Sequence, residues 1–266
     1  MKKIAKILAI VMIVALAVTA FCACGDKNNN GANDVTTTAA NGEQTPAAGK
    51  LIMGTNAAFP PYEYYEGDKI VGIDAEVAAL IAEKLGMELE IKDMDFGGII
   101  GAVESGVIDM GMAGMTVNEE RLLSVDFSTS YAKGIQVVIV KAGSDIATID
   151  DLAGKKIGVQ EATTGDAYAT GDFGEENVKR YTNGAAAVAA LQSGIVDAVI
   201  IDNEPAKAFV AANEGLAILE TAYADEDYAI AVAKGNTELL SKINNALAEL
   251  TADGSIQRVV NKYIPA

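Results

Sequence analysis

Apolar positions along most of the chain follow two periods in turn, one typical of strands and one typical of helices. Residues 51–55 predict a short strand, and the alternation at 87–91 predicts a second. Between them, apolar residues recur three and four positions apart, with Asp74 as the expected N-cap and Gly86 as the stop. The pattern therefore predicts strand, helix and strand in this order.

The same order continues toward the end of the chain. A second helix is expected after Phe96, Gly97 and Gly98, with Gly106 as its terminator. Alternating strands and helices indicate an α/β fold with a largely parallel sheet. Further predicted strands lie at 108–112, 134–140, 156–159, 197–201 and 228–233, and further helices lie after Asp166, at 184–192 and at 239–250.

A short motif occurs twice, each time between a predicted helix and a predicted strand. Residues 105–109 and 193–197 both have the form Ser-Gly-apolar-apolar-Asp. Five positions beyond each aspartate lie Gly114 and Asp202, which would occupy equivalent strand ends if both halves used the same αβ unit. Ligands of open α/β sheets bind at the carboxyl ends of strands, so Arg121 and Asp202 would then lie on opposite walls of a site. The alternative is that the match is only a common helix stop.

The stretch 108–127 carries the strongest candidate chemistry. Its strand ends in small residues that let a ligand approach the backbone, and Thr116 stands three positions before Glu119, the spacing of a helix-capping box. Arg121 follows, and its guanidinium matches a carboxylate in a two-pronged geometry. A solvated surface charge is the alternative for this arginine. Asp202 favours a site, because it ends an apolar strand where an unpaired buried carboxylate is costly.

The N-terminal segment has the order of a secretory signal. Basic residues precede the apolar run 7–21, which is too short for a secure membrane span. The residues around Cys22 and Cys24 resemble a bacterial lipoprotein cleavage box, in which a small residue precedes a cysteine that is lipidated. We therefore expect a signal peptide at 1–23 and lipidation of Cys24, with Cys22 or a plain signal peptide as the alternatives. Residues 24–49, which are low in large apolar side chains, are expected to form a flexible tether.

Composition argues against several classes of function. The formal net charge of −17 argues against nucleic-acid binding, which needs a basic surface. The chain has no histidine, so histidine-based catalysis and histidine metal ligation are excluded. Both cysteines lie in the N-terminal segment, so the folded part is expected to carry no disulfide and no cysteine metal site. We expect no other metal site and no cofactor. No second long apolar run follows, so nothing suggests a membrane-spanning transporter.

With these residues identified, the chain resembles the polar amino-acid-binding proteins of bacterial ABC importers, which have the type II periplasmic-binding-protein fold. The resemblance covers about residues 51–264. It is carried by the order and spacing of short motifs at 54–63, 71–74, 94–100, 113–121 together with 126–128, and 202–203.

The resemblance implies a two-lobed receptor that closes over one amino acid and delivers it to a membrane permease. Lobe 1 would comprise residues 50–134 and 229–266, and lobe 2 would comprise residues 139–224. Two hinge strands, near 135–138 and 225–228, would join the lobes. Such a receptor is expected to be a monomer outside the cytoplasm, attached to the cell membrane by lipid, and not an enzyme.

The resemblance also implies roles for single residues. In such proteins the arginine at the Arg121 position clamps the α-carboxylate of the ligand, and the aspartate at the Asp202 position takes the α-ammonium. A zwitterion removed from water needs both charges and additional hydrogen bonds. The positions of Phe59 and Phe96 sandwich the ligand side chain. The groups expected to assist belong to Ala113, Gly114, Thr116, Thr163 and Thr164, and side-chain selectivity is set in relatives at the positions of Asn56, Glu63, Gln160, Glu161 and Ile201.

The neutral residue Asn56 shapes the expected ligand. Some relatives that select cationic ligands have an acidic residue at this position, whereas Glu161 adds a negative charge whose direction the sequence does not give. We therefore expect glutamine or another uncharged polar amino acid. Two other functions remain open: a dehydratase-like enzyme of the same fold acting on a prephenate-like acid, and a sensor or lytic-enzyme module of the same fold.

Overall fold

A computed structural model describes residues 49–220 and 222–264 of the chain. The predicted signal peptide, the lipidation of Cys24 and nearly all of the tether fall in residues 1–48, so they lie outside the described residues. No helix within the described ranges is long and apolar enough to span a membrane.

The first of two lobes, lobe 1, is built on a five-stranded sheet with the order β5-β1-β6-β14-β7. β1 pairs in parallel with β5 on one side and with β6 on the other, and β14 is antiparallel to both of its neighbours. The sheet therefore combines early strands with one from near the end of the chain. The strands are β1 (Lys50–Thr55), β5 (Glu88–Asp93), β6 (Met110–Gly111), β7 (Val125–Phe127) and β14 (Ala231–Ala233).

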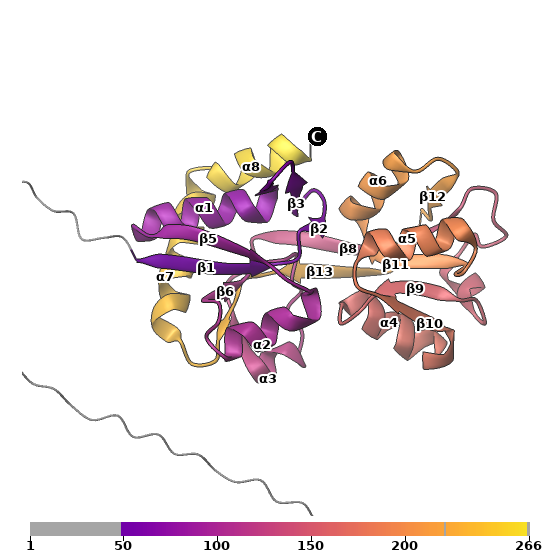
Figure 1. The fold of residues 1–266 in the computed structure, drawn as a ribbon, viewed down its shortest axis with the longest axis horizontal. Coiled ribbons are helices and arrows are strands. Elements are labelled where there is room, and N and C mark those ends of the chain that lie inside the picture. Colours follow the sequence, from indigo (N-terminus) through magenta and orange to yellow (C-terminus); the bar gives the residue numbers. More distant parts are fainter. Residues whose placement is uncertain (1–48, 221, 265–266) are drawn as a thin grey trace, which may run out of the picture. The chain divides into compact units, whose positions relative to one another are not determined.

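Helices cover both faces of this sheet. Figure 1 shows α1 and α8 on one side of it and α2 and α3 on the other. α1 ends where the sequence predicts, because Gly86 takes the left-handed conformation of a helix stop. The elements are α1 (Ile73–Leu85), the 3-10 turn η1 (Phe96–Gly98), α2 (Ile99–Glu104), α3 (Arg121–Ser124), α7 (Thr237–Ala252), α8 (Ser255–Tyr263), and a small separate sheet of β2 (Ala58–Phe59), β3 (Glu63–Glu66) and β4 (Lys69–Val71).

Lobe 2 is built on a six-stranded sheet with the order β10-β9-β11-β8-β12, in which β13 also pairs with β8. β9 is parallel to β10 and β11, whereas β8 is antiparallel to β11, β12 and β13. In Figure 1, α5 and α6 lie on one side of this sheet and α4 lies on the other. The elements are β8 (Ala132–Lys141), η2 (Ile149–Leu152), β9 (Ile157–Gln160), α4 (Thr164–Phe173), η3 (Glu175–Asn177), β10 (Val178–Tyr181), α5 (Gly184–Ser193), β11 (Ala198–Asp202), α6 (Asn203–Ala212), β12 (Leu216–Ile218) and β13 (Ala224–Tyr228).

Two antiparallel segments join the lobes. β8 and β13 are paired as far as Ala132 and Tyr228. Beyond that ladder, the Ser128 N–H donates to the Ile230 carbonyl at 2.9 Å, so the pairing continues into lobe 1. The chain thus enters lobe 2 along one segment and leaves it along the other.

The repeated Ser-Gly-apolar-apolar-Asp motif has the same geometry in both lobes. The carboxylate of Asp109 accepts from the Ile52 N–H at 2.7 Å, and that of Asp197 accepts from the Lys156 N–H at 2.8 Å. Each aspartate therefore holds the start of its own strand to the parallel neighbour, β1 in one lobe and β9 in the other. The two motifs therefore lie in equivalent αβ units, which is one of the two alternatives that the sequence left open.

Asp74 does not have the helix-capping role predicted for it. Gly72 holds the N-cap position of α1 and makes no side-chain bond there, while Asp74 lies in the first turn and is fully buried. The side chain faces the interior because it has internal partners, which belong to the site described below.

The predicted capping box of Thr116 and Glu119 is also wrong. α3 begins at Arg121, and the Arg121 N–H donates to the Asn118 side chain at 2.8 Å. Asn118, three residues before Arg121, therefore accepts from the first N–H of the helix, because amide oxygens are good acceptors for the orphan N–H groups of a first turn.

Several strand and helix predictions differ from the structure. β6 contains only Met110–Gly111, although Ile108 and Met112 are buried as the alternation predicts. The run at 228–233 is divided between β13 and β14, and α8 follows α7 unpredicted. Both sheets are mixed rather than largely parallel, because the crossing segments run antiparallel to the strands of each lobe.

Candidate functional site

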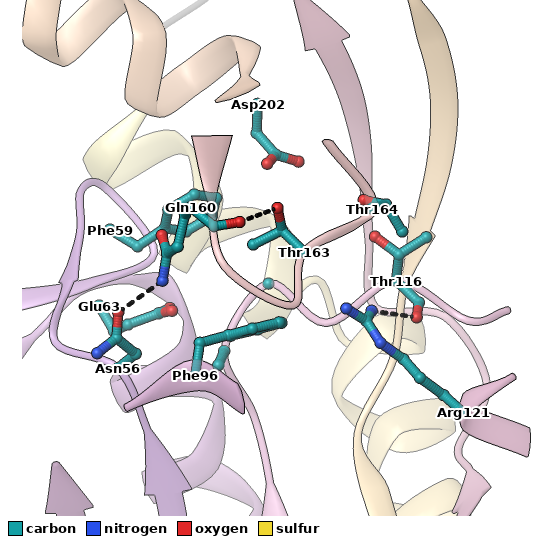
Figure 2. Close-up of a pocket in the computed structure, with 12 residues that line it drawn as sticks. Asn56, Phe59, Glu63, Phe96, Thr116, Arg121, Gln160, Thr163, Thr164 and Asp202 are labelled. Atoms are coloured by element: carbon teal, nitrogen blue, oxygen red, sulfur yellow. Dashed lines mark hydrogen bonds between the residues drawn. The ribbon is translucent and has the colours of Figure 1, made fainter. Parts of the chain in front are cut away.

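A cavity between the two lobes brings the predicted ligand-binding residues together (Figure 2). The space between its walls is about 320 Å³, a value that includes open solvent. Every residue in the predicted ligand-binding set lines it, and Glu63 completes the lining. The lining residues are Asn56, Phe59, Glu63, Phe96, Ala113, Gly114, Thr116, Arg121, Gln160, Thr163, Thr164 and Asp202.

Arg121 is a buried cation held in a fixed orientation. Its Nη1 donates to the Thr116 carbonyl at 2.7 Å, and its Nη2 donates to the Ala162 carbonyl of lobe 2 at 3.1 Å. The guanidinium carbon lies 5.2 Å from the ring centroid of Phe96, within cation–π range. Burial lowers the pKa of Arg121, and the neighbouring carboxylates, Glu226 first among them, oppose this shift. Arg121 is therefore no solvated surface charge, and its remaining N–H groups are available to an anion.

The start of α4 adds backbone donors to the same end of the cavity. Thr163 is the N-cap: its hydroxyl accepts from the Asp166 N–H at 3.2 Å and donates to the Gln160 carbonyl at 2.8 Å. Helix geometry leaves the N–H groups of Thr164 and Gly165 without an intrahelical acceptor. The positive end of the helix dipole and these free donors favour an anion such as a carboxylate.

Asp202 ends β11 on the lobe 2 side of the cavity and is buried. The hydroxyl of Tyr228 donates to its carboxylate. Burial raises the pKa of Asp202, and the nearby Glu226 carboxylate raises it further. A cation brought to this carboxylate would favour its ionised form, so the site suits an ammonium group.

Glu226 is a functional candidate that the sequence did not indicate. It lies on β13, is buried, and accepts from the Thr116 hydroxyl and from the Gln136 amide, both at 3.0 Å. It therefore connects a cavity residue of lobe 1 to the crossing segment β8. Its signal was present in the alternation of β13, because Glu226 shares the inward face with Tyr228.

The opposite end of the cavity has a different chemistry. In Figure 2, Asn56, Glu63 and Gln160 lie together, away from Arg121 and Thr164. The Gln160 amide donates to the Asn56 side-chain oxygen at 3.0 Å across the two lobes. Glu63 is only 1% exposed, and neither of its oxygens has a hydrogen-bond partner among the described residues.

Gly114 lines the cavity, and its N–H already has a partner within the protein. Its N–H donates to the Asp74 carboxylate at 2.8 Å, so this group is not free for a ligand. Gly114 has a φ of 53°, and a Cβ there would lie 2.8 Å from the Phe59 ring. The position therefore requires glycine for close approach of the backbone to the aromatic ring.

Two residues expected to set selectivity lie elsewhere. Glu161 is exposed and lines a separate surface hollow together with Thr182. Ile201 is buried in β11, beside Gly184 of α5. Neither side chain borders the cavity, because successive residues of a loop or strand point in different directions.

Comparison with known proteins identifies the family. The family of bacterial extracellular solute-binding proteins, family 3, matches residues 51–266. The arginine-binding extracellular protein ArtP of Bacillus subtilis (strain 168) is 33% identical over 262 residues, which cover 96% of each chain. Structures of an ancestral arginine-binding protein bound to glutamine and bound to arginine are each 44% identical, cover 82% of this chain and 99% of that one, and have TM-scores of 0.79 and 0.77.

These similarities confirm the predicted two-lobed α/β fold and the predicted class of protein. The relatives are named as binding proteins and not as enzymes. The dehydratase-like alternative is therefore not supported.

Proposed function

Because the chain belongs to family 3 of the bacterial extracellular solute-binding proteins, we propose that it captures a free polar L-amino acid outside the cytoplasm and delivers it to an ABC permease. One observation carries this proposal: a buried arginine and a buried aspartate, Arg121 and Asp202, line the same cavity. A zwitterion that leaves water needs one cationic and one anionic partner. The amino-acid ligands named for the relatives support the same class.

Different residues of the lining bind the backbone groups and the side chain of the ligand. Arg121 and the first N–H groups of α4 bind the α-carboxylate, and Asp202 binds the α-ammonium. Phe59 and Phe96 border the side chain with apolar surface. The side chain ends near the polar residues Asn56, Glu63 and Gln160, which supports a ligand with a polar end such as the amide of glutamine.

Binding is proposed to close the lobes about hinges near 135–138 and 225–228, with lobe 1 formed by 50–134 plus 229–266 and lobe 2 by 139–224. Two contacts across the cleft support this division. Arg121 reaches the Ala162 carbonyl, and Gln160 reaches Asn56. Such contacts can form only when the two lobes are together.

The N-terminal proposal rests on sequence alone. A signal peptide at 1–23 is removed, Cys24 is lipidated, and residues 24–49 tether a monomer to the cell membrane. The proposed function requires neither a metal nor a cofactor, because the charges that a zwitterion needs come from side chains.

A thermal-shift screen of the twenty amino acids tests the proposal. A ligand that binds only the native state stabilises it by RT ln(1 + [L]/Kd), about 2.7 kcal/mol at a hundredfold excess over Kd. We expect glutamine or another polar amino acid to raise the Tm, with D-enantiomers as the control. A screen in which no amino acid raises the Tm contradicts the proposed function.

A further inference from the structure

Two carboxyl groups, Glu63 and Asp74, lie behind the side-chain end of the cavity. Glu63 on β3 lines the cavity, and neither oxygen has a hydrogen-bond partner among the described residues. Asp74 on α1 is fully buried and accepts from the Gly114 N–H and the Tyr131 hydroxyl, both at 2.8 Å. The two acids therefore differ in how well their surroundings stabilise a negative charge.

Within residues 49–220 and 222–264, no cation pairs with either acid. Among the ion pairs of the described residues, none includes Glu63 or Asp74. Three other titratable groups interact electrostatically with Glu63. They are the Asp202 carboxyl on β11 and the hydroxyls of Tyr62 and Tyr131. Each of these groups is either acidic or neutral.

Glu63 and Asp74 are both buried, and the charge of Asp74 acts on Glu63. Two such acids cannot both ionise at low cost, so the pair retains a proton. Asp74 already accepts two hydrogen bonds and is the better anion, which leaves the proton on Glu63. The pKa values agree with this assignment. Desolvation and then the charge of Asp74 raise the pKa of Glu63 well above its ordinary value, and desolvation raises the pKa of Asp74 to about 6.

The protonation state of Glu63 determines which ligand side chain it complements. A protonated carboxyl has one O–H donor, which suits the carbonyl oxygen of a side-chain amide. An ionised carboxylate only accepts, and it suits a guanidinium or an ammonium group. A single glutamate can therefore serve a neutral ligand and a cationic ligand in turn.

We propose that Glu63 is a proton-exchanging specificity residue, which keeps its proton over an amide side chain and releases it when a guanidinium or ammonium side chain binds. In the second case the O–H bond of Glu63 breaks, the electron pair stays on the carboxylate and the proton passes to the buffer. The positive charge of the ligand then takes the place of the proton in offsetting the buried carboxylates. This inference rests on the proposed amino-acid-binding function.

The test compares proton release for two ligands on the full chain. L-glutamine and L-arginine are titrated by calorimetry at pH 7 in phosphate and in Tris, whose ionisation enthalpies differ. Both ligands present the same α-ammonium and α-carboxylate, so proton exchange at Asp202 contributes equally and cancels in the difference. Arginine is expected to release up to about one proton more than glutamine, and its affinity relative to glutamine is expected to rise by up to about tenfold per pH unit where Glu63 retains its proton.

A variant identifies the residue that exchanges the proton. Glu63→Gln is expected to weaken arginine by about a hundredfold or more relative to glutamine and to abolish the difference in proton release. Glu161 is an exposed carboxyl outside the cavity, so Glu161→Gln is the matched control. It should change neither the affinity for arginine nor the difference in proton release. If Glu63→Gln does not fold, the difference in proton release between the two ligands on the parent chain tests the proposal by itself.

The outcomes separate this inference from the proposed function. Equal proton release for both ligands, or binding of glutamine with no binding of arginine up to pH 8.5, overturns the role of Glu63 and leaves the proposed function standing. Tight arginine binding by Glu63→Gln also overturns it. Binding of no amino acid at all overturns both.

Discussion

The Nη2 of Arg121 donates a 3.1 Å hydrogen bond to the backbone carbonyl of Ala162, so the guanidinium of one lobe is fastened to the other. Ala162 has a φ of 64°, a left-handed conformation that is uncommon for alanine. Its N–H donates to the Asp166 carboxylate at 3.2 Å, which helps to hold the loop before α4. The carboxylate end of the cavity is therefore assembled only where the two lobes meet.

Arg121→Ala is expected to abolish most amino-acid binding without unfolding the chain. Removal of one partner of a buried charge pair costs roughly 3–5 kcal/mol. Affinity should therefore fall by about a hundredfold to several thousandfold, since each 1.4 kcal/mol is about a tenfold change in Kd. Arg121→Lys should also lose much of the affinity, because an ammonium cannot reproduce the two-pronged contact. Calorimetric titration with the best ligand of the screen measures both.

Lys179 is the control for this series, because it is an exposed cation on β10. Lys179→Ala should change the affinity little. Binding by Arg121→Ala within about threefold of the parent would show that Arg121 does not clamp the ligand.

Asp202→Asn should weaken every amino-acid ligand by a similar factor, because all of them share the α-ammonium. Asparagine keeps the size of the side chain but removes the charge, so a loss of about a hundredfold or more is expected from the same cost of an unpaired buried charge. Titration with two ligands of different side chains measures the factor. A large loss for one ligand and none for the other would assign Asp202 to side-chain recognition.

Lobe closure can be trapped by a disulfide between Gly97 and Ala162. A Cβ built at Gly97 lies 3.3 Å from the Ala162 Cβ across the cleft, near the range of about 3.5–4.5 Å that disulfides span. With Cys22 and Cys24 replaced by serine, Gly97→Cys with Ala162→Cys should cross-link faster when the ligand is present. The rate is read on a gel after addition of a mild oxidant.

A matching cysteine pair within one lobe should cross-link at the same rate with and without ligand. The radius of gyration from X-ray scattering should fall when ligand is added to the parent chain. A cross-linking rate that does not change with ligand would contradict closure on binding.

Glu63→Gln is expected to make stability less dependent on pH. The raised pKa of Glu63 means that the folded chain keeps a proton that the unfolded chain releases above about pH 4.3. Stability of the parent therefore falls, through this residue, as the pH rises from that value toward the raised pKa. The Tm of the variant minus that of the parent should increase from pH 5 to pH 8. The increase should be about 2–4 °C for each 1 kcal/mol by which the free energy of unfolding of the parent falls.

Calorimetric scans without ligand measure this difference. Glu161→Gln, scanned in parallel, should show no such trend, since this side chain is exposed. A constant Tm difference across the pH range would mean that Glu63 is ionised in the folded chain.

Lipidation of Cys24 is expected to add a diacylglyceryl group at a new N-terminus. The reason is the order of basic, apolar and small residues before the cysteine. Intact-mass measurement of membrane-extracted protein should show a chain that begins at Cys24, and Cys24→Ser should release the protein from the membrane. A mature form that begins elsewhere without lipid would rule the anchor out.

The charged ends of the site could be predicted from the sequence, whereas their neighbours could not. Arg121 and Asp202 could be predicted because each lies at or after the end of a strand with a clear apolar pattern. The repeated motif also relates the two strand ends. Glu226 was not found, because its two hydrogen bonds come from Thr116 and Gln136, distant in the chain. The alternation of β13 indicates that Glu226 faces inward, but it does not show which distant residues Glu226 contacts.

Asp74 shows why a correct helix can still give a wrong role. Its position near the start of α1 agrees with a cap, and only the packing of α1 against the loop at Gly114 shows that the carboxylate points inward. The same packing removes the Gly114 N–H from the set of ligand donors. Local propensity locates the helix, but tertiary contacts decide what each polar side chain does.

The place of β14 between β6 and β7 has a consequence for synthesis on the ribosome. The sheet of lobe 1 lacks an internal strand until residue 233 has been made, although most of its residues are translated first. Lobe 2 is continuous from β8 to β13, so its core can close while lobe 1 is still incomplete. Lobe 2 is therefore the first lobe that can fold, although it is translated second. Lobe 1 can complete its sheet only near the end of translation.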